Sequence, residues 1–137
     1  MRAPFDGALI TTLVTAGEQE VEQALATAHA LFRDRDAWLA PSRRIAILRK
    51  AAQLMAQRAE ALALEAAREG GKPLLDSRVE VARAIDGVLL CAEFLRSEAG
   101  HVIPMNVDAA SARRFAFTLR EPIGVVVAVS AFNHPLN

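Results

Sequence analysis

The sequence has little of what marks several large classes of protein. Its one cysteine, Cys91, cannot form an internal disulfide and favours a reducing compartment, which we expect to be the cytoplasm. Seven glycines and six prolines are too few for a low-complexity chain. Sixteen basic and sixteen acidic side chains give a formal net charge of zero, which argues against a general nucleic-acid binder.

Targeting and membrane signals are also missing from the pattern. The first residues lack the apolar core of a signal peptide. The longest uncharged stretch, residues 122–137, contains prolines, a glycine and asparagines, so we expect no membrane span. The histidines His29, His101 and His134 are scattered without ligand-pair spacing, and we expect no metal site.

Helical periodicity covers most of residues 18–70. A first helix is predicted from about Glu18 to Phe32, opened by a capping box in the segment from Thr15 to Glu18. A second begins at Pro41, where proline's missing N–H is tolerated, and continues to the Gly70-Gly71 pair. The apolar positions of this second helix recur at alternating spacings of three and four residues: Ile45, Leu48, Ala52, Met55, Ala59, Leu62 and Ala66.

A third helix is predicted from about Leu74 to Ala99, with Gly100 as its C-terminal cap. Its apolar seam consists of Val81, Ile85, Val88, Ala92 and Leu95. Cys91 lies in the middle of this helix, where neither a helix N-terminus nor a basic cluster is near enough to activate a thiol. We therefore predict that Cys91 is a small buried hydrophobe and not a nucleophile.

Short extended segments flank the predicted helices. Asp6-Gly7 predicts a turn between residues 3–5 and 8–14. Residues 102–107 and 115–119 predict a two-stranded ribbon that turns at 108–112, because apolar and polar residues alternate in its second strand. A pair of strands is marginal by itself, so we expect the ribbon to lie against another chain or domain.

The chain is organised around residues 122–137. The run from Ile123 to Val129 is apolar and β-branched, which is typical of a strand buried on both faces of a parallel sheet. The loop that leaves the carboxyl end of such a strand, here Ser130 to Pro135, is where open α/β sheets bind ligands. A buried parallel strand needs neighbours that this sequence does not supply. We interpret the chain as the front part of a longer one.

Asn133 has the clearest chemistry in that loop. Its neutral amide carries two N–H donors that could stabilise a developing oxyanion; the alternative is that it only shapes a turn. His134 is more simply a packed or solvent-facing loop histidine than a base. Ser130 lacks the Gly-x-Ser-x-Gly flanks of a serine hydrolase nucleophile.

Residues 120–137 closely resemble the aldehyde dehydrogenase superfamily, whose segment there reads Glu-Pro-x-Gly-Val-x-x-x-Ile-x-Pro-Trp/Phe-Asn-Phe/His-Pro-Leu. The start of the second predicted helix and the segment from Glu65 to Val81 are similar to other stretches of the same family, in the same order. The resemblance covers essentially the whole chain. The Phe-Asn-His-Pro-Leu-Asn ending is most similar to the branch of lactaldehyde, phosphonoaldehyde and non-phosphorylating glyceraldehyde-phosphate dehydrogenases.

The resemblance implies an α/β fold, of which this chain is the N-terminal and mostly helical part. Residues 1–100 would be the N-terminal helical part of the cofactor-binding domain. Residues 101–121 would be an oligomerisation β-ribbon. Residues 122–137 would be the first strand and loop of an incomplete, Rossmann-like dinucleotide-binding sheet.

The resemblance also implies oxidation of an aldehyde to a carboxylic acid with NAD or NADP, through a cysteine thiohemiacetal. Asn133 matches the asparagine that holds the oxyanion of that adduct. The loop that lines the cofactor cleft is matched by Val129, Ser130, Ala131 and Phe132, with Ser130-Ala131 in place of the commoner Thr-Pro or x-Pro. Residues 101–120 match a ribbon that extends a partner subunit's sheet, which implies a homodimer or homotetramer.

The family's cofactor-ribose lysine, glycine-rich turn, general-base glutamate and nucleophilic cysteine would all lie beyond Asn137. We therefore expect no dehydrogenase activity from this chain alone and activity in a full-length parent. We also expect the isolated chain to aggregate through its apolar run. The alternative is a non-catalytic helical module for dimerisation or as an adaptor, built from the amphipathic helices and the self-pairing ribbon.

Overall fold

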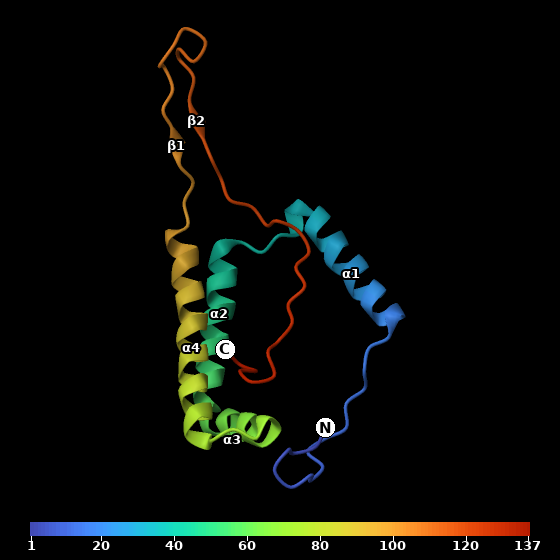
Figure 1. Ribbon diagram of the computed structural model, residues 1–137. Coiled ribbons are helices and arrows are strands. Elements are labelled where there is room, and N and C mark those ends of the chain that lie inside the picture. Colours follow the sequence, from blue (N-terminus) through green and yellow to red (C-terminus); the bar gives the residue numbers. More distant parts are fainter.

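The computed structural model describes residues 1–137. Its elements, in chain order, are α1 (Glu18–Arg33), the 3-10 helix η1 (Arg35–Ala37), α2 (Pro41–Gln57), α3 (Ala59–Gly70), α4 (Leu74–Ser97), β1 (Val102–Ile103) and β2 (Ala116–Phe117). Figure 1 shows α2 and α4 side by side, with α3 across their lower end and α1 apart from them. None of the helices is long and apolar enough to cross a membrane.

The small core lies where α2 and α3 pack against α4. Its buried apolar residues are Ala52, Ala63, Ala66, Val81, Ala84 and Ala92. All but one of them are alanines, whose small side chains let helices approach closely. The predicted apolar stripe and seam both face this contact, since every one of their residues is buried or half-buried. Those two predictions are confirmed.

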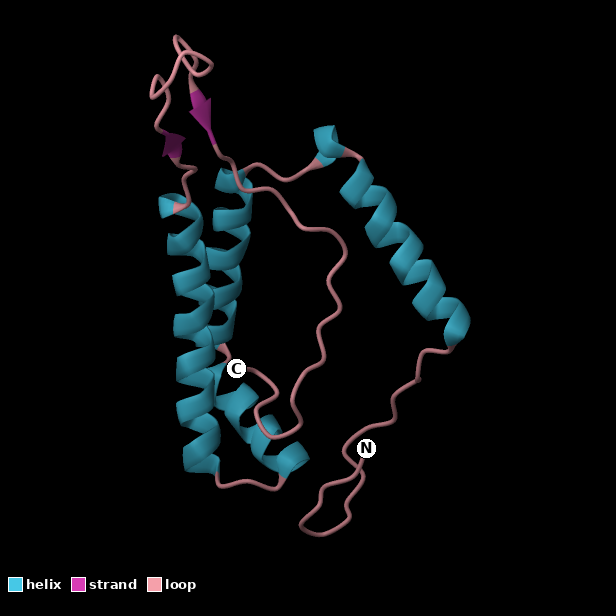
Figure 2. Cartoon of the chain, turned by 45° about the horizontal axis from the view of Figure 1, so that its top comes forward, coloured by secondary structure: helices cyan, strands magenta, loops and turns pink.

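The second predicted helix is in fact two helices. Arg58 leaves the helical conformation (φ −113°, ψ 14°), and α3 starts again at Ala59 in a new direction (Figure 2). The prediction of a single helix from Pro41 to Gly70 was wrong. The three-and-four spacing of apolar residues continues across the bend, so the sequence pattern does not reveal it. Residues on both sides of it bury against the same partner, α4, so the spacing of three and four continues unbroken.

The helix ends also differ from the prediction in two places. The N-cap of α1 is Gly17, whose N–H donates to the Glu20 carboxylate at 2.9 Å, so the capping box lies two residues later than predicted. Helix α4 ends at Ser97, and Gly100 does not cap it. A side chain at Gly100 would overlap the backbone carbonyl of Thr118, so this glycine is required by the ribbon's close approach.

Both predicted β-turns are present. In the N-terminal hairpin, the Ala3 N–H donates to the Ala8 carbonyl and the Ala8 N–H to the Asp6 carboxylate, each at 2.9 Å. The ribbon is antiparallel, with Val102 opposite Phe117 and Ile103 opposite Ala116. Its strands are shorter than predicted, but its place and its turn are confirmed.

The expected buried strand from Ile123 to Val129 is not formed. The segment is extended and runs from the ribbon back to the lower end of the helices (Figure 1), but no strand pairs with it. Ile123 is 92% exposed and Val129 is 91% exposed. A strand requires a hydrogen-bonded neighbour, and no other part of this chain supplies one.

Candidate functional site

The loop that carries Asn133 is bound to the turn between α3 and α4. The Lys72 Nζ donates to the backbone carbonyl of Asn133 at 3.0 Å. Three residues further on, the Leu136 N–H donates to Glu80 Oε1 at 2.8 Å. Beside these bonds lies an open pocket of about 330 Å³, lined by Lys72, Asp76, Val79, Glu80, Arg83, Asn133 and His134. The loop therefore meets the helices through polar contacts.

Glu80 is the buried centre of this site. Its side chain is 1% exposed and forms a salt bridge with Lys72, whose side chain is 16% exposed. His134 Nδ1 lies 3.8 Å from the same carboxylate. Burial raises the pKa of Glu80, but the hydrogen bonds from Lys72 and Leu136 and the electrostatic effects of Lys72 and His134 outweigh it. The net pKa is below its ordinary value of 4.5, so the carboxylate is ionised at neutral pH.

The local sequence explains how Lys72 and Glu80 meet. Gly71 ends α3 in the left-handed conformation (φ 66°), as the Gly70-Gly71 pair predicted. Pro73 then precedes the first residue of α4, and Lys72 is left in the tight connection between the helices. Glu80 follows on the second turn of α4, on the face that also buries Val81 and Ala84. The two charged groups thus lie on the same side of the α3–α4 junction.

A buried hydroxyl without a hydrogen-bond partner lies about one helical turn before Glu80 in α4. Ser77 is fully buried, and its Oγ makes no hydrogen bond. It is three positions before Glu80, so both side chains lie on the same face of α4.

The Asn133 side chain is exposed, and its backbone carbonyl is the atom that binds the helices. No side-chain bond of Asn133 shapes the turn; instead, Ser130 Oγ donates to the Pro135 carbonyl at 3.2 Å and closes the loop. Val129, Ala131 and Phe132 are exposed like Asn133. The amide of Asn133 is therefore free to donate to a ligand, beside a loop surface free to contact one.

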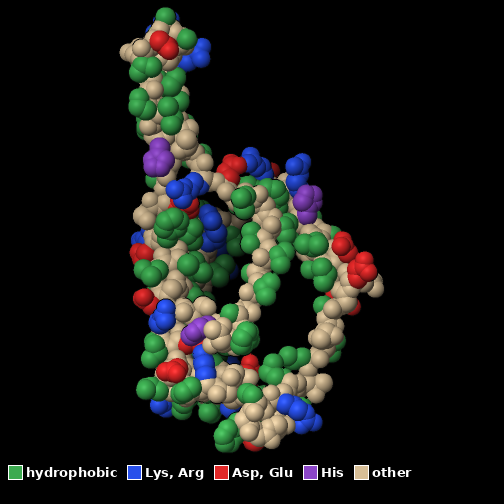
Figure 3. Space-filling model, viewed as in Figure 1, with side chains coloured by type: hydrophobic (Ala, Val, Ile, Leu, Met, Phe, Trp, Pro, Cys, Tyr) green, Lys and Arg blue, Asp and Glu red, His purple; other side chains and the backbone are tan.

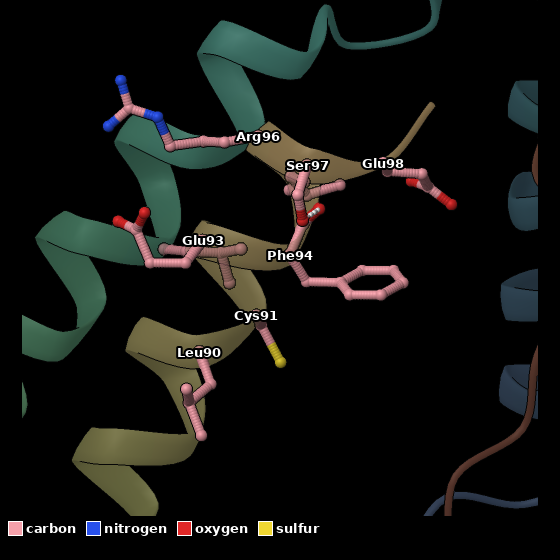
Figure 4. A pocket seen from close by; sticks show the side chains of 9 residues that line it. Leu90, Cys91, Glu93, Phe94, Arg96, Ser97 and Glu98 are labelled. Atoms are coloured by element: carbon pink, nitrogen blue, oxygen red, sulfur yellow. Dashed lines mark hydrogen bonds between the residues drawn. The ribbon is translucent and has the colours of Figure 1, made fainter. Parts of the chain in front are cut away.

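Cys91 is exposed, and the prediction that it is buried was wrong. The buried line of α4 passes through Val88, Ala92 and Leu95, and Cys91 lies about 100° around the helix from Ala92. Its thiol and the Phe94 ring point to the same side of α4 (Figure 4). They line an open groove of about 930 Å³ with Leu48, Leu90, Glu93, Leu95, Arg96, Ser97 and Glu98.

Sequence reasoning missed Lys72 and Glu80 as site residues. One signal was present: Ser77, Glu80 and Ala84 continue the helical spacing of the buried face with polar residues in it. A buried charge needs a partner, and Lys72 is a basic residue in the adjoining turn. No cluster of three or more His, Cys, Asp or Glu side chains is placed to hold a metal ion.

Comparison with known proteins gives a match over the full chain. The model of the Aldehyde dehydrogenase family matches residues 1–137. Aspartate-semialdehyde dehydrogenase 1 of Pseudomonas canavaninivorans is 34% identical over 134 residues, which cover 98% of this chain and 28% of that protein. The lactaldehyde dehydrogenase of Methanocaldococcus jannaschii is 33% identical over 134 residues, which cover 98% of this chain and 27% of that protein.

A solved structure agrees with these relatives. The crystal structure of glyceraldehyde-3-phosphate dehydrogenase GapN from Methanocaldococcus jannaschii, complexed with NADP, is similar with a TM-score of 0.88 and 32% sequence identity. The similarity covers 99% of this chain and 28% of GapN. The chain thus spans about a quarter of the length of the relatives it matches.

Proposed function

Because the chain belongs to the aldehyde dehydrogenase family, we propose that it is the N-terminal part of an enzyme that oxidises an aldehyde to a carboxylic acid with NAD or NADP. The observation that carries this proposal is the family match over residues 1–137. It is supported by similarity to lactaldehyde dehydrogenase and to NADP-bound GapN, each above 30% identity. We place the enzyme in the branch of lactaldehyde, phosphonoaldehyde and non-phosphorylating glyceraldehyde-phosphate dehydrogenases.

In this proposal Asn133 is the oxyanion donor. When a cysteine thiolate adds to the aldehyde carbon, the carbonyl π electrons move to oxygen, and the Asn133 amide donates a hydrogen bond to that oxygen. The amide is free of other bonds, while the backbone beside it is fixed by Lys72. A preorganised donor of this kind contributes about 10²–10³-fold to the rate.

Residues Val129 to Phe132 form the proposed cofactor surface. They fit a nicotinamide ring because they carry no charge and leave an exposed face next to Asn133. NAD or NADP, when bound there, supplies the acceptor for the hydride. The contribution of this chain is to line the cleft and to exclude water from the reacting carbon.

Cys91 is not the nucleophile in this proposal. It lies eleven residues beyond Glu80 in α4, a rise of about 16 Å along the helix axis, and faces the groove shown in Figure 4. Since Cys91 is the only cysteine, we propose that the 137-residue chain has no dehydrogenase activity alone. The thiolate would come from the rest of the full-length protein.

We further propose that residues 101–120 pair with a partner subunit in a homodimer or homotetramer. The ribbon stands clear of the helices, and hydrophobic side chains cover much of it (Figure 3). Among them, Val102, Phe115 and Phe117 are exposed. A two-stranded ribbon without a supporting layer is marginal in water, and added strands would cover it. Residues 122–137 would then begin the Rossmann-like sheet.

The test is an Asn133→Ala change in the full-length enzyme, assayed by NAD(P)H formation with short aldehydes. We expect the acylation rate to fall by about 10²–10³-fold with little change in KM. Gln57→Ala, at an exposed amide at the end of α2, is the control and should leave the rate unchanged. An unchanged rate in Asn133→Ala would refute the oxyanion role, and no NAD(P)H formation by the unmodified enzyme would refute the activity.

A further inference from the structure

The loop that presents Asn133 is fixed at two points by one ion pair. Lys72 Nζ holds the carbonyl of Asn133 itself at 3.0 Å. Glu80 Oε1 holds the N–H of Leu136 at 2.8 Å. Lys72 and Glu80 also bind each other, so the two anchor points are coupled through a single salt bridge. The backbone from Asn133 to Leu136 is thus tied to the helices at both ends.

The hydrogen-bond partners of Lys72 and Glu80 indicate that the pair holds the loop in place. A buried ion pair is weak evidence for stability, because the desolvation of two charges offsets their attraction. Apart from Lys72, the Glu80 carboxylate has two polar contacts, the Leu136 N–H at 2.8 Å and His134 Nδ1 at 3.8 Å, and both come from residues 130–137. Lys72 likewise divides its hydrogen bonds between Glu80 and the loop. The pair therefore joins the loop to the helices.

A second ion pair joins α3 to α4 and has no hydrogen bond to the loop. Arg78 of α4 binds Glu60 of α3 through two hydrogen bonds, of 3.0 and 2.6 Å. Both of its side chains are more than half exposed, and neither forms a hydrogen bond or an ion pair with residues 130–137. The two ion pairs therefore differ in one respect: only Lys72 and Glu80 bind the loop.

We propose that Lys72 and Glu80 are positioning residues, which hold the backbone from Asn133 to Leu136 so that the Asn133 amide is aimed at the reacting oxygen. This inference rests on the proposed function of Asn133. A displacement of about 1 Å in a catalytic group can lower a rate by about 10²-fold. The loss should appear in kcat, because the bond to the oxyanion forms only as the charge develops.

The experiment uses the full-length enzyme with Lys72→Met, Glu80→Leu and the double variant. Each single change leaves one buried charge without its partner and should lower both the unfolding temperature and kcat. The double variant removes both charges, so the unfolding temperature should largely recover. In the double variant, kcat should stay at least about tenfold low with KM little changed, because the loop is no longer anchored. Recovery of kcat together with the unfolding temperature would overturn the inference.

Two further measurements separate positioning from folding. In an Asn133→Ala background, the double variant should lower kcat no further; an additive loss would show that the pair does not act through Asn133. Arg78→Met with Glu60→Leu is the matched control pair and should leave kcat unchanged.

If the apolar variants do not fold, Glu80→Gln keeps the size and an acceptor for Leu136. It should lower kcat less than tenfold with Leu136 still protected from hydrogen exchange, and a full kcat loss with that protection intact would contradict the inference.

The outcomes also distinguish this inference from the proposed function. An unmodified full-length enzyme that oxidises no aldehyde refutes the proposed function, and the positioning role falls with it. An active enzyme whose Asn133→Ala variant is impaired, but whose double variant is as fast as the unmodified one, refutes the positioning role alone.

Discussion

At the scale of single residues, Glu60 and Glu80 show how burial changes the effect of losing an ion-pair partner. The hydrogen bond from Arg78 lowers the pKa of Glu60, but that side chain is in solvent, where an ion pair contributes little. Glu80 is buried, so its charge depends on Lys72 and on the loop. Loss of the ion-pair partner should therefore destabilise the fold far more at Glu80 than at Glu60.

Acid should destabilise this chain partly through Glu80. Its folded-state pKa is below the ordinary value of 4.5, so the unfolded state binds the proton more tightly. The stabilisation it provides is fully present above the unfolded-state pKa and is lost as pH falls through the folded-state pKa. We expect the unfolding temperature, followed by circular dichroism, to fall less on acidification in Glu80→Gln than in the unmodified chain. Glu60→Gln should follow the unmodified chain, and equal slopes for all three would contradict this account.

The role or burial of a residue could be predicted from the sequence where residues close to it in the chain determine its surroundings. Asn133 stood out because a long apolar run delivers it to a polar loop. Leu136, which Glu80 anchors, is fifty-six positions away from Glu80 and becomes its neighbour only through the fold. Cys91 was predicted to be buried because it lies three positions after Val88 and four before Leu95. Ala92 lies four after Val88 and three before Leu95, so the spacing fits both residues equally well. In the structure, Ala92 is the one that is buried and Cys91 is exposed.

At the scale of elements, two glycines should respond to alanine in opposite ways. Gly71 has a φ of 66°, and an added Cβ would lie 2.7 Å from Pro4 Cγ. Gly87 is inside α4, and an added Cβ would meet nothing within 4 Å. We expect Gly71→Ala to lower the free energy of unfolding by about 1–2 kcal/mol and Gly87→Ala to raise it by about 0.5–1 kcal/mol. Urea unfolding of the dilute chain measures both, and shifts of the same sign would contradict the prediction.

The alanine contact between the helices should not accept a larger side chain. Ala92 is fully buried on α4, whereas Ala82 on the same helix is exposed. Ala92→Leu should therefore lower the free energy of unfolding by about 1–3 kcal/mol through overpacking. Ala82→Leu adds the same atoms to the surface and should change it little. If the two variants unfold at the same urea concentration, the contact is looser than the structure shows.

Element types were easier to predict than their ends. The helical spacing, the Gly70-Gly71 stop and the ribbon turn are local signals, and all three are confirmed. The bend at Arg58 carries no such signal, because Arg58 is an ordinary helix-forming residue and the apolar stripe continues across it. Only the contact with α4 shows that the direction of the chain must change there.

At the scale of the whole molecule, this chain is open. Only 8 of its 137 residues are buried, and α1 has no buried residue at all. Hydrophobic side chains also cover the segment that returns from the ribbon (Figure 3). The predicted strand from Ile123 to Val129 has neither a hydrogen-bonded neighbour nor a layer to cover its apolar faces, so it is not formed. Exposed apolar surface of this extent marks an interaction site or an aggregation hazard.

A charge in the exposed apolar run should therefore improve the behaviour of the isolated chain. Val127 is 76% exposed in an extended and unpaired segment, which can pair with the same segment of another molecule. We expect the unmodified chain to aggregate and Val127→Lys to reduce this, as measured by light scattering after gel filtration. Gln57→Lys adds the same charge at the exposed end of α2 and should not help. A monodisperse unmodified chain would refute the prediction.

The distance along the chain between Glu80 and Leu136 also sets an order of events during synthesis. Lys72 and Glu80 are eight residues apart, so they leave the ribosome almost together and can pair as soon as α4 begins to form. Leu136 is made fifty-six residues later, after the whole ribbon. We therefore expect Glu80 to pair with Lys72 before the Leu136 N–H is available to its second oxygen. We expect the Asn133 loop to attach to the helices only after α4 and the ribbon have been made.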